Sequence, residues 1–239
     1  MRLMGNGASA LSTLIFSCLA TACTAGLSLA APVYGPNMPA RDRWFMGCQT
    51  NLVFERNMRK GLGEAESVQY FYDSSYGIYD WFSFDGKLGI GDTAFDTREA
   101  GGLSLKDGFA GGYGVRFRIY NNEGQRLKAI FGFQHISAHP PCKEVNNVKY
   151  SAIWDEWQLS LLVATTIGDR WQPYVGAKAS QLYIIRRDNQ ETDWRWNGAR
   201  DHVGLFAGVS FEMGKDWYLN VDGRLIDETA VSAGIHHRL

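Results

Sequence analysis

The sequence lacks any long apolar run beyond its first 30 residues, since no later stretch approaches 18 consecutive apolar residues. That absence excludes further membrane-spanning helices. An excess of one charge is also lacking: 24 Lys and Arg stand against 25 Asp and Glu, so nothing indicates a nucleic-acid partner. Of the four cysteines only Cys48 and Cys142 lie beyond residue 30. Their expected locations, on a strand face and in a Pro-rich loop, argue against a disulfide, and their spacing argues against a metal site.

Residues 1–30 have the features of a cleaved secretory signal peptide. Arg2 gives a positive start, residues 11–25 are apolar or small without charge, and Ser28-Leu29-Ala30 offers the small residues that a signal peptidase reads. We therefore expect cleavage after Ala30, an N-terminal extension at 31–40 and one folded domain at 41–239. A retained membrane anchor and a lipidated cysteine are the alternatives.

Tryptophan is placed repeatedly where a short polar turn meets an alternating segment. The four cases are Asp42-Arg43-Trp44, Asp80-Trp81, Asp169-Arg170-Trp171 and Gly214-Lys215-Asp216-Trp217. After each, apolar and polar residues alternate for about ten residues, the length of a strand that crosses a bilayer at a tilt. Because tryptophan settles where hydrocarbon meets water, these four predict one interfacial girdle of a barrel. Trp154 and Trp157 are expected in a second girdle at the opposite interface.

The alternating segments predict an all-β fold with ten strands, with eight as the alternative. The strands are expected at about 44–55, 68–77, 81–91, 109–120, 125–137, 150–165, 171–185, 202–213, 217–226 and 230–239. Tight turns at 77–80, 121–124, 168–170 and 214–216 alternate with long loops at 57–67, 92–108, 138–149 and 186–201; only 227–229 breaks this rule. Short turns on one side and longer loops on the other are typical of an antiparallel up-and-down transmembrane β-barrel.

Alternation alone does not say which face of a strand lies inside. In the strand at 109–120, Tyr113, Val115 and Phe117 share one face, while Arg116 and Arg118 share the other with glycines. A soluble sandwich or lipocalin-like barrel would bury the apolar face. Glycines and charges of both signs on the polar face, and aromatics at strand ends, favour the membrane arrangement instead.

These segments resemble the small outer-membrane β-barrel proteins of Gram-negative bacteria, the porin-like group that includes the outer-membrane protein A-type barrels. The turn and strand at 76–84 carry the resemblance, and Gly234 and Leu239 match the family's C-terminal assembly signal, while Ala233 and His237 depart from it. The resemblance implies export to the cell outer membrane. It also implies contact with the barrel-assembly machinery and with outer-membrane lipid or lipopolysaccharide. We expect no cofactor.

Parity directs a set of charged side chains into the lumen: Asp85, Lys87, Arg116, Arg118, Lys128, Glu156, Lys178, Glu212, Asp222, Arg224 and Arg238. In a narrow barrel, charges of both signs are expected to pair, because an unpaired ion in a low-dielectric tube is costly. A sealed, structural barrel is therefore the first hypothesis. A narrow, porin-like passage with a mild anion preference is the alternative.

Two further functions remain open. His135 and Ser137 lie two apart on one strand face that should meet lipid, which resembles the His-x-Ser pair of outer-membrane lipid A deacylases; Glu144 is the nearest acid. A plain polar rim is the alternative, and we do not expect an enzyme. The loop with Trp194 and Trp196 could instead grip a partner, as in an adhesin. No metal site is expected, because His236 and His237 point to opposite faces.

Overall fold

The computed structural model describes residues 34–59, 61–97, 101–190 and 193–239, and the expected signal peptide lies outside these ranges. The strands are β1 (Trp44–Asn57), β2 (Glu64–Tyr79), β3 (Phe82–Thr97), β4 (Gly101–Asn122), β5 (Leu127–His139), β6 (Lys143–Val145), β7 (Val148–Thr165), β8 (Trp171–Asp188), β9 (Arg195–Gly198), β10 (Val203–Glu212), β11 (Trp217–Leu225) and β12 (Thr229–Arg238). No helix among the described residues is long and apolar enough to cross a membrane.

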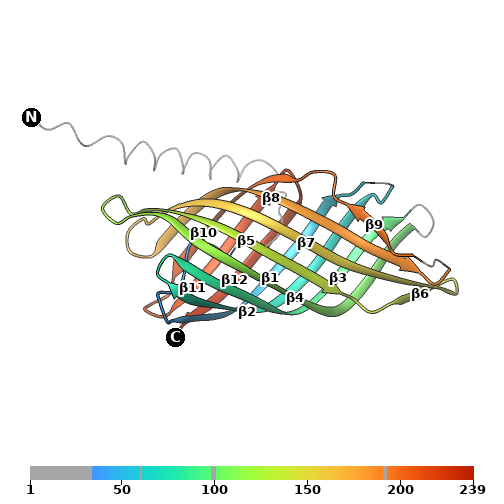
Figure 1. Cartoon of the computed structure of the whole chain (residues 1–239), viewed down its shortest axis with the longest axis horizontal. Helices are drawn as coiled ribbons and strands as arrows, with labels where there is room; N and C mark the ends of the chain where they lie inside the picture. Colours follow the sequence, from blue (N-terminus) through green and yellow to red (C-terminus); the bar gives the residue numbers. More distant parts are fainter. Residues whose placement is uncertain (1–33, 60, 98–100, 191–192) are drawn as a thin grey trace, which may run out of the picture.

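Ten long strands form one closed antiparallel barrel, as the sequence predicts (Figure 1). Each long strand pairs with the next long strand, which includes β5 with β7, β7 with β8 and β8 with β10, and β1 pairs with β12 to close the wall. The two remaining strands, β6 and β9, are short and extend β7 and β8 beyond the barrel wall. Closure satisfies the backbone hydrogen bonds of both edge strands, which a membrane-spanning sheet requires.

The two ends of the barrel differ. At one end four tight turns connect the strands, and both β1 and β12 have their chain termini there. At the other end the strands run further than the sequence predicts: β3 and β4 stay paired up to Thr97 and Gly101, within the segment expected to be a loop. Cross-strand hydrogen bonds, which the alternation pattern does not report, carry this hairpin beyond the barrel wall.

Strands β10, β11 and β12 are short. Beyond them, at the long-loop end, backbone contacts between other segments close the barrel. Met58 forms a bridge with Ala199, the Arg59 amide donates to the Gly198 carbonyl at 2.9 Å, and the Arg200 amide donates to the Asn57 carbonyl at 2.7 Å. Strand β9 therefore joins β8 to the end of β1. The turn between β11 and β12 lies beneath this connection.

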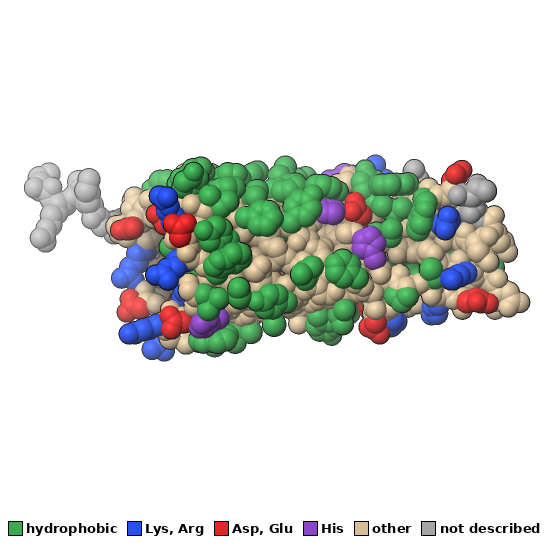
Figure 2. Space-filling view, turned by 60° about the horizontal axis from the view of Figure 1, so that its bottom comes forward, with side chains coloured by type: hydrophobic (Ala, Val, Ile, Leu, Met, Phe, Trp, Pro, Cys, Tyr) green, Lys and Arg blue, Asp and Glu red, His purple; other side chains and the backbone are tan. Residues whose placement is uncertain are grey.

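The outer surface is apolar and the interior is mixed. Figure 2 shows hydrophobic side chains across the middle of the barrel, with charged side chains gathered at its two ends. Large side chains that point outward include Tyr72, Leu88, Leu159 and Leu205. An apolar band flanked by polar ends is the surface of a transmembrane barrel, not of a soluble one.

At the long-loop end the lumen holds an apolar cluster: Phe95, Leu105, Trp154, Leu182 and Ile184 are among its buried members. The prediction that Trp154 belongs to an interfacial girdle is therefore wrong, since Trp154 is 0% exposed. It shares strand parity with the buried Glu156, whereas Trp157 points outward. The strand's alternation decides the direction of each side chain, even for an aromatic near a strand end.

Candidate functional site

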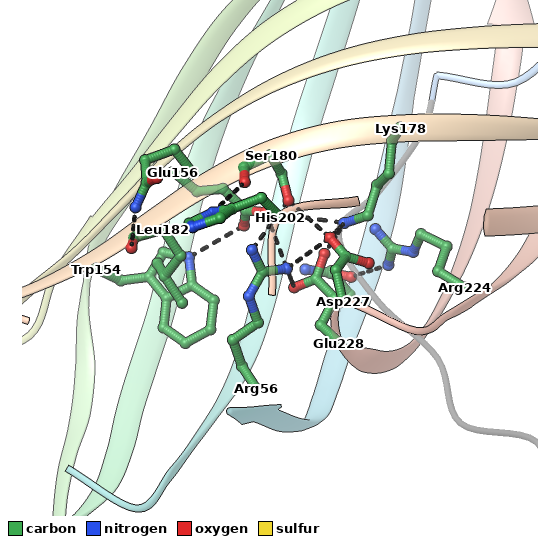
Figure 3. Close-up of polar contacts among 12 residues, drawn as sticks. Arg56, Trp154, Glu156, Lys178, Ser180, Leu182, His202, Arg224, Asp227 and Glu228 are labelled. Atoms are coloured by element: carbon green, nitrogen blue, oxygen red, sulfur yellow. Dashed lines mark hydrogen bonds and ion pairs between the residues drawn. The ribbon is translucent and has the colours of Figure 1, made fainter. Parts of the chain in front are cut away.

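The centre of the lumen holds a cluster of five charged side chains, drawn in Figure 3: Arg56, Glu156, Lys178, Asp227 and Glu228. Arg56 Nη1 lies 2.8 Å from Asp227 Oδ2 and 2.9 Å from Glu228 Oε2. Lys178 Nζ lies 3.0 Å from Asp227 Oδ2 and also contacts Glu228. Glu156 Oε1 is 3.9 Å from both cations. Every side chain in this central cluster is at most 4% exposed.

Three members of the central cluster were absent from the predicted lumen set. Asp227 and Glu228 come from the turn between β11 and β12, which folds into the lumen instead of projecting outward. Ile226 begins that turn at a φ of 84°, a costly conformation for a β-branched residue. Arg56 follows a register shift between Val53 and Arg56, and this bulge turns its side chain inward. The one signal in the sequence for this inward turn was that 227–229 is the single short connection on the long-loop side.

A second polar network lines the lumen on the short-turn side of this cluster. Arg224 contacts Asp222 at 3.2 Å and donates to Asn51 Oδ1 at 2.6 Å. Asn51 donates to Gln69 at 3.0 Å, and Lys87 donates to Gln49 at 2.5 Å. Uncharged amides thus accept hydrogen bonds from Arg224 and Lys87, which satisfies more of the hydrogen-bonding capacity of these cations than ion pairs alone.

The structure places each predicted lumen charge on the inner side of the wall. Asp85, Lys87, Arg116, Glu156, Lys178, Asp222 and Arg224 are buried, and Arg118, Lys128, Glu212 and Arg238 are half-buried. Arg238 holds Glu212 through two contacts of 2.6 Å, and Lys128 donates to Gln172 at 2.7 Å. The half-buried charges form the rim of the short-turn mouth.

Residues 34–40, expected only as an N-terminal extension, lie inside the lumen at its short-turn end. Residues 35–39 are all buried, and Arg116 Nη1 donates to the Asn37 carbonyl at 2.5 Å. Arg116 is held from its other side by Asp85, at 2.9 and 2.7 Å. Burial raises the pKa of the Tyr34 hydroxyl well above its usual value, and Asp85 and Asp73 add to the shift, so Tyr34 is neutral. This internal segment gives no alternating pattern that sequence reasoning could have used.

The short-turn end carries the predicted girdle positions on its outer side. Trp44, Trp81, Trp171 and Trp217 are all exposed at the starts of their strands or in the adjoining turn. Gly234 faces inward, and the Leu239 amide donates to the Trp44 carbonyl at 2.8 Å. His236 points inward to Asp73 at 2.8 Å, whereas His237 lies against Trp217 on the outer side.

A polar cluster lies on the lipid side of β5 and β7. His135 Nε2 is 2.8 Å from Asp155 Oδ1, and Ser137 Oγ is 2.8 Å from His139 Nε2. The acid beside His135 is thus Asp155, not Glu144, which is exposed on β6 opposite Lys149. Asp155 belongs to the neighbouring strand and faces Ser137 across the ladder, so spacing along the chain could not reveal it. The ring of His135 also stacks near Trp157, with centroids 4.2 Å apart.

Trp194 and Trp196 lie at the long-loop end, and the two cysteines are far apart. Both tryptophans are exposed, and Arg187 lies 4.9 Å above the Trp194 ring. Cys48 and Cys142 are free thiols, on the outer face of β1 and in the β5–β6 connection. Within the described ranges, no group of three His, Cys, Asp or Glu side chains is placed to hold a metal ion.

No protein-family model matches the sequence, and no curated protein matches it. The structure is similar to the translocator domain of the autotransporter NalP from Neisseria meningitidis (TM-score 0.46, 12% identity, covering 95% of this chain and 98% of that chain). It is also similar to the β domain of the Bordetella autotransporter BrkA (TM-score 0.48, 13% identity, 84% and 100%). A third similar structure is Ail of Yersinia pestis (TM-score 0.43, 10% identity, 84% and 100%).

A closed barrel with an even number of strands, an outward apolar band and short turns at one end is the architecture of outer-membrane proteins. By its own fold this chain is an outer-membrane β-barrel protein. In such barrels the short turns lie on the periplasmic side.

Proposed function

We propose that this protein is a structural outer-membrane barrel whose lumen does not conduct. The observation that carries the proposal is that side chains fill the lumen at three successive levels. The apolar cluster closes the extracellular end, the central cluster closes the middle, and residues 34–40 close the periplasmic end. A ten-stranded barrel is narrow enough for side chains to achieve this.

The charges of the central cluster support a seal better than a pore. A permeating anion would need free cationic groups along its path, yet Arg56 and Lys178 each contact carboxylates of the inward-folded turn. Moving an ion past them would separate buried pairs, which costs several kcal/mol per broken contact. The closed barrel instead gives a rigid support for the sheet that β3, β4 and β7–β9 extend above the membrane.

Single-channel recording of the refolded 31–239 protein in planar bilayers tests this function. We expect no discrete steps at either polarity. A fluorophore on Cys142 counts the inserted barrels, so that silence is not confused with a lack of protein. Discrete steps from the unaltered chain would contradict the proposal and favour the porin-like alternative, and charge reversal at Arg116 would then change its ion preference.

A second function, an acyl-ester hydrolase acting on lipid, is favoured by the polar cluster on β5 and β7. A hydrolase needs a serine in contact with a base and an acid that orients a base. Here Ser137 contacts His139, while Asp155 contacts His135. The serine and the acid therefore engage different histidines, which makes this the weaker candidate. Its position on the lipid side fits a membrane substrate.

Release of fatty acid from purified lipopolysaccharide, followed by mass spectrometry, tests the hydrolase. Ser137→Ala and His139→Ala should each lower any activity by about 100-fold or more, the usual effect of losing a nucleophile or its base. Ser74→Ala is the matched control, because Ser74 also lies on a strand face away from the lumen. Equal activity in Ser137→Ala and Ser74→Ala would rule out Ser137 as the nucleophile.

A further inference from the structure

Residues 34–40 lie inside the barrel without joining its wall. The strands complete their backbone pairing with one another, and no strand of the sheet includes this segment. A buried chain outside a ladder still needs partners for its backbone groups. Arg116 supplies them: its Nη1 donates to the Asn37 carbonyl at 2.5 Å and lies within 3.5 Å of the Tyr34 and Gly35 carbonyls.

Side chains of the barrel wall hold Arg116 in place. Its Nε and Nη2 donate to the two carboxylate oxygens of Asp85, at 2.9 and 2.7 Å, and Nη2 also donates to Ser75 at 3.2 Å. The fork geometry of a guanidinium paired in this way leaves Nη1 aimed into the lumen. A guanidinium that is held in place and donates hydrogen bonds to main-chain carbonyls is a feature of peptide-binding sites.

Tyr34, Gly35 and Asn37 of the segment also contact the wall. The Tyr34 ring lies 4.1 Å from Lys87 Nζ and 5.1 Å from Arg116 Cζ, so two cations face its π-system. Gly35 has a φ of +72°, which L side chains rarely adopt, and a Cβ there would lie 2.5 Å from Asn220 Oδ1, so that any other residue is strained and must displace the Asn220 side chain. Asn37 Nδ2 donates to Ser210 Oγ at 2.8 Å.

Met38 fills an apolar pocket. Its neighbours in that pocket are Ile130, Leu162, Ala164, Tyr174 and Phe206. Beside the segment the remaining cavity is about 10 Å³, room for about one water. The segment therefore fits closely at Gly35, Asn37 and Met38.

The connection to the barrel adds no specific contact inside the site. At the periplasmic mouth the chain turns through exposed residues, where the Arg41 amide donates to Asp80 and the Asp42 amide donates to the Gly77 carbonyl. The segment thus enters through the mouth, and a separate peptide could enter the same way. The central cluster above it does not depend on its contacts, so withdrawal of the segment opens a pocket and not a pore.

We propose that the periplasmic half of the lumen is a binding site for a short peptide, occupied in this structure by the chain's own residues 34–40 and able to take a similar peptide from another molecule. The ligand class is a short, bent segment that carries, in order, an aromatic residue, glycine, proline, an amide side chain and an unbranched apolar side chain. The site rests on the closed lumen of the proposed function, since only a closed central level makes it a pocket.

The test measures binding of a fluorescent peptide of residues 34–41 to the full mature chain by fluorescence anisotropy. Gly35→Val displaces the chain's own segment by the clash with Asn220, and Met38→Asp does so by placing a charge in the apolar pocket. Gly168→Val is the matched control, because Gly168 also has a positive φ, of 61°, but lies in an exposed turn with nothing near a Cβ.

We expect the Gly35→Val and Met38→Asp chains to bind the peptide at least about 10-fold more tightly than the unaltered and Gly168→Val chains, whose own segment competes at high effective concentration. A peptide with Met38→Ala should bind the displaced chains about 10-fold or more weakly, since it leaves the pocket empty. Equal binding by all four chains, or by both peptides, would overturn the site.

Displacement is checked separately in a chain with Cys48→Ser, Cys142→Ser and Met38→Cys. A water-soluble maleimide should label the thiol at position 38 slowly in this chain. When Gly35→Val is added, labelling should be at least about 10-fold faster, because the segment then leaves the lumen. No acceleration would contradict the steric argument, and with it the proposal. If both displaced chains fail the heat-modifiable gel shift of a folded barrel, the segment is part of the folding core and the exchangeable site is refuted. Conductance is not used here, so a failure of this site is distinguished from a failure of the proposed function.

Discussion

Loss of Arg56 should destabilise this barrel more than loss of any exposed arginine. Arg56 is fully buried and contacts Asp227 and Glu228 at 2.8 and 2.9 Å. Two cations and three carboxylates give the central cluster a formal charge of −1, and Arg56→Met lowers it to −2. Removing one partner of a buried ion pair leaves an uncompensated charge and costs about 3–5 kcal/mol. We expect a loss of that size in the free energy of unfolding.

The assay is urea unfolding of the refolded barrel in lipid vesicles, followed by tryptophan fluorescence. Arg59→Met is the matched control, because Arg59 lies in the same segment but is exposed, and it should change stability by less than about 1 kcal/mol. Adding Glu228→Gln to Arg56→Met restores the formal charge to −1. The double variant should therefore be more stable than Arg56→Met alone, with a coupling of about 1–3 kcal/mol.

Two results would refute this reasoning. One is a stability of Arg56→Met within about 0.5 kcal/mol of the unaltered chain, which would mean that water reaches the cluster and screens it. The other is additivity of the two substitutions, which would mean that Arg56 and Glu228 do not interact in the folded barrel.

Two further predictions concern the direction of side chains. Trp154→Ala should cost about 3–5 kcal/mol in unfolding free energy, as for a large buried aromatic, while the outward Trp157→Ala should cost less than half as much; equal losses would contradict the inward position of Trp154. In vesicles, a charged maleimide should label Cys142 in its exposed connection and leave Cys48 on the apolar face of β1 unlabelled, and mass spectrometry of the labelled chain distinguishes the two; labelling of Cys48 would place β1 outside the bilayer.

The sequence predicts the parts of this molecule that repeat. Ten alternating segments and the contrast between tight turns and long connections led to the correct barrel, since a period of two is imposed locally by the strand backbone. The same parity places Asp85, Lys87 and Arg116 on the inner side. The same parity requires Trp154 to point inward. The assignment of Trp154 to an interfacial girdle with Trp157 went against that parity and was wrong.

Features that depend on contacts between distant segments were beyond sequence reasoning. A bulge before Arg56 changes its side-chain direction without a visible break in the pattern. Asp155 meets His135 only because β5 and β7 are in a particular register. The position of residues 34–40 depends on a lumen whose width and lining are set by all ten strands. In each case the deciding partner lies on another strand, so local spacing carries no information about it.

The order of the three side-chain levels along the barrel axis determines where this barrel can bind other molecules. An apolar level at the extracellular end and a charge-paired level at the centre both complete their contacts among the barrel's own strands and turns. The periplasmic level differs, because it is filled by residues 34–40, which connect to the barrel through an exposed turn. This segment is bound by Arg116, Ser210 and an apolar pocket. Exchange of an occupant there disturbs neither sealed level. Under the two proposals, the closed middle of the barrel lets the periplasmic end bind a peptide without opening a path through the membrane.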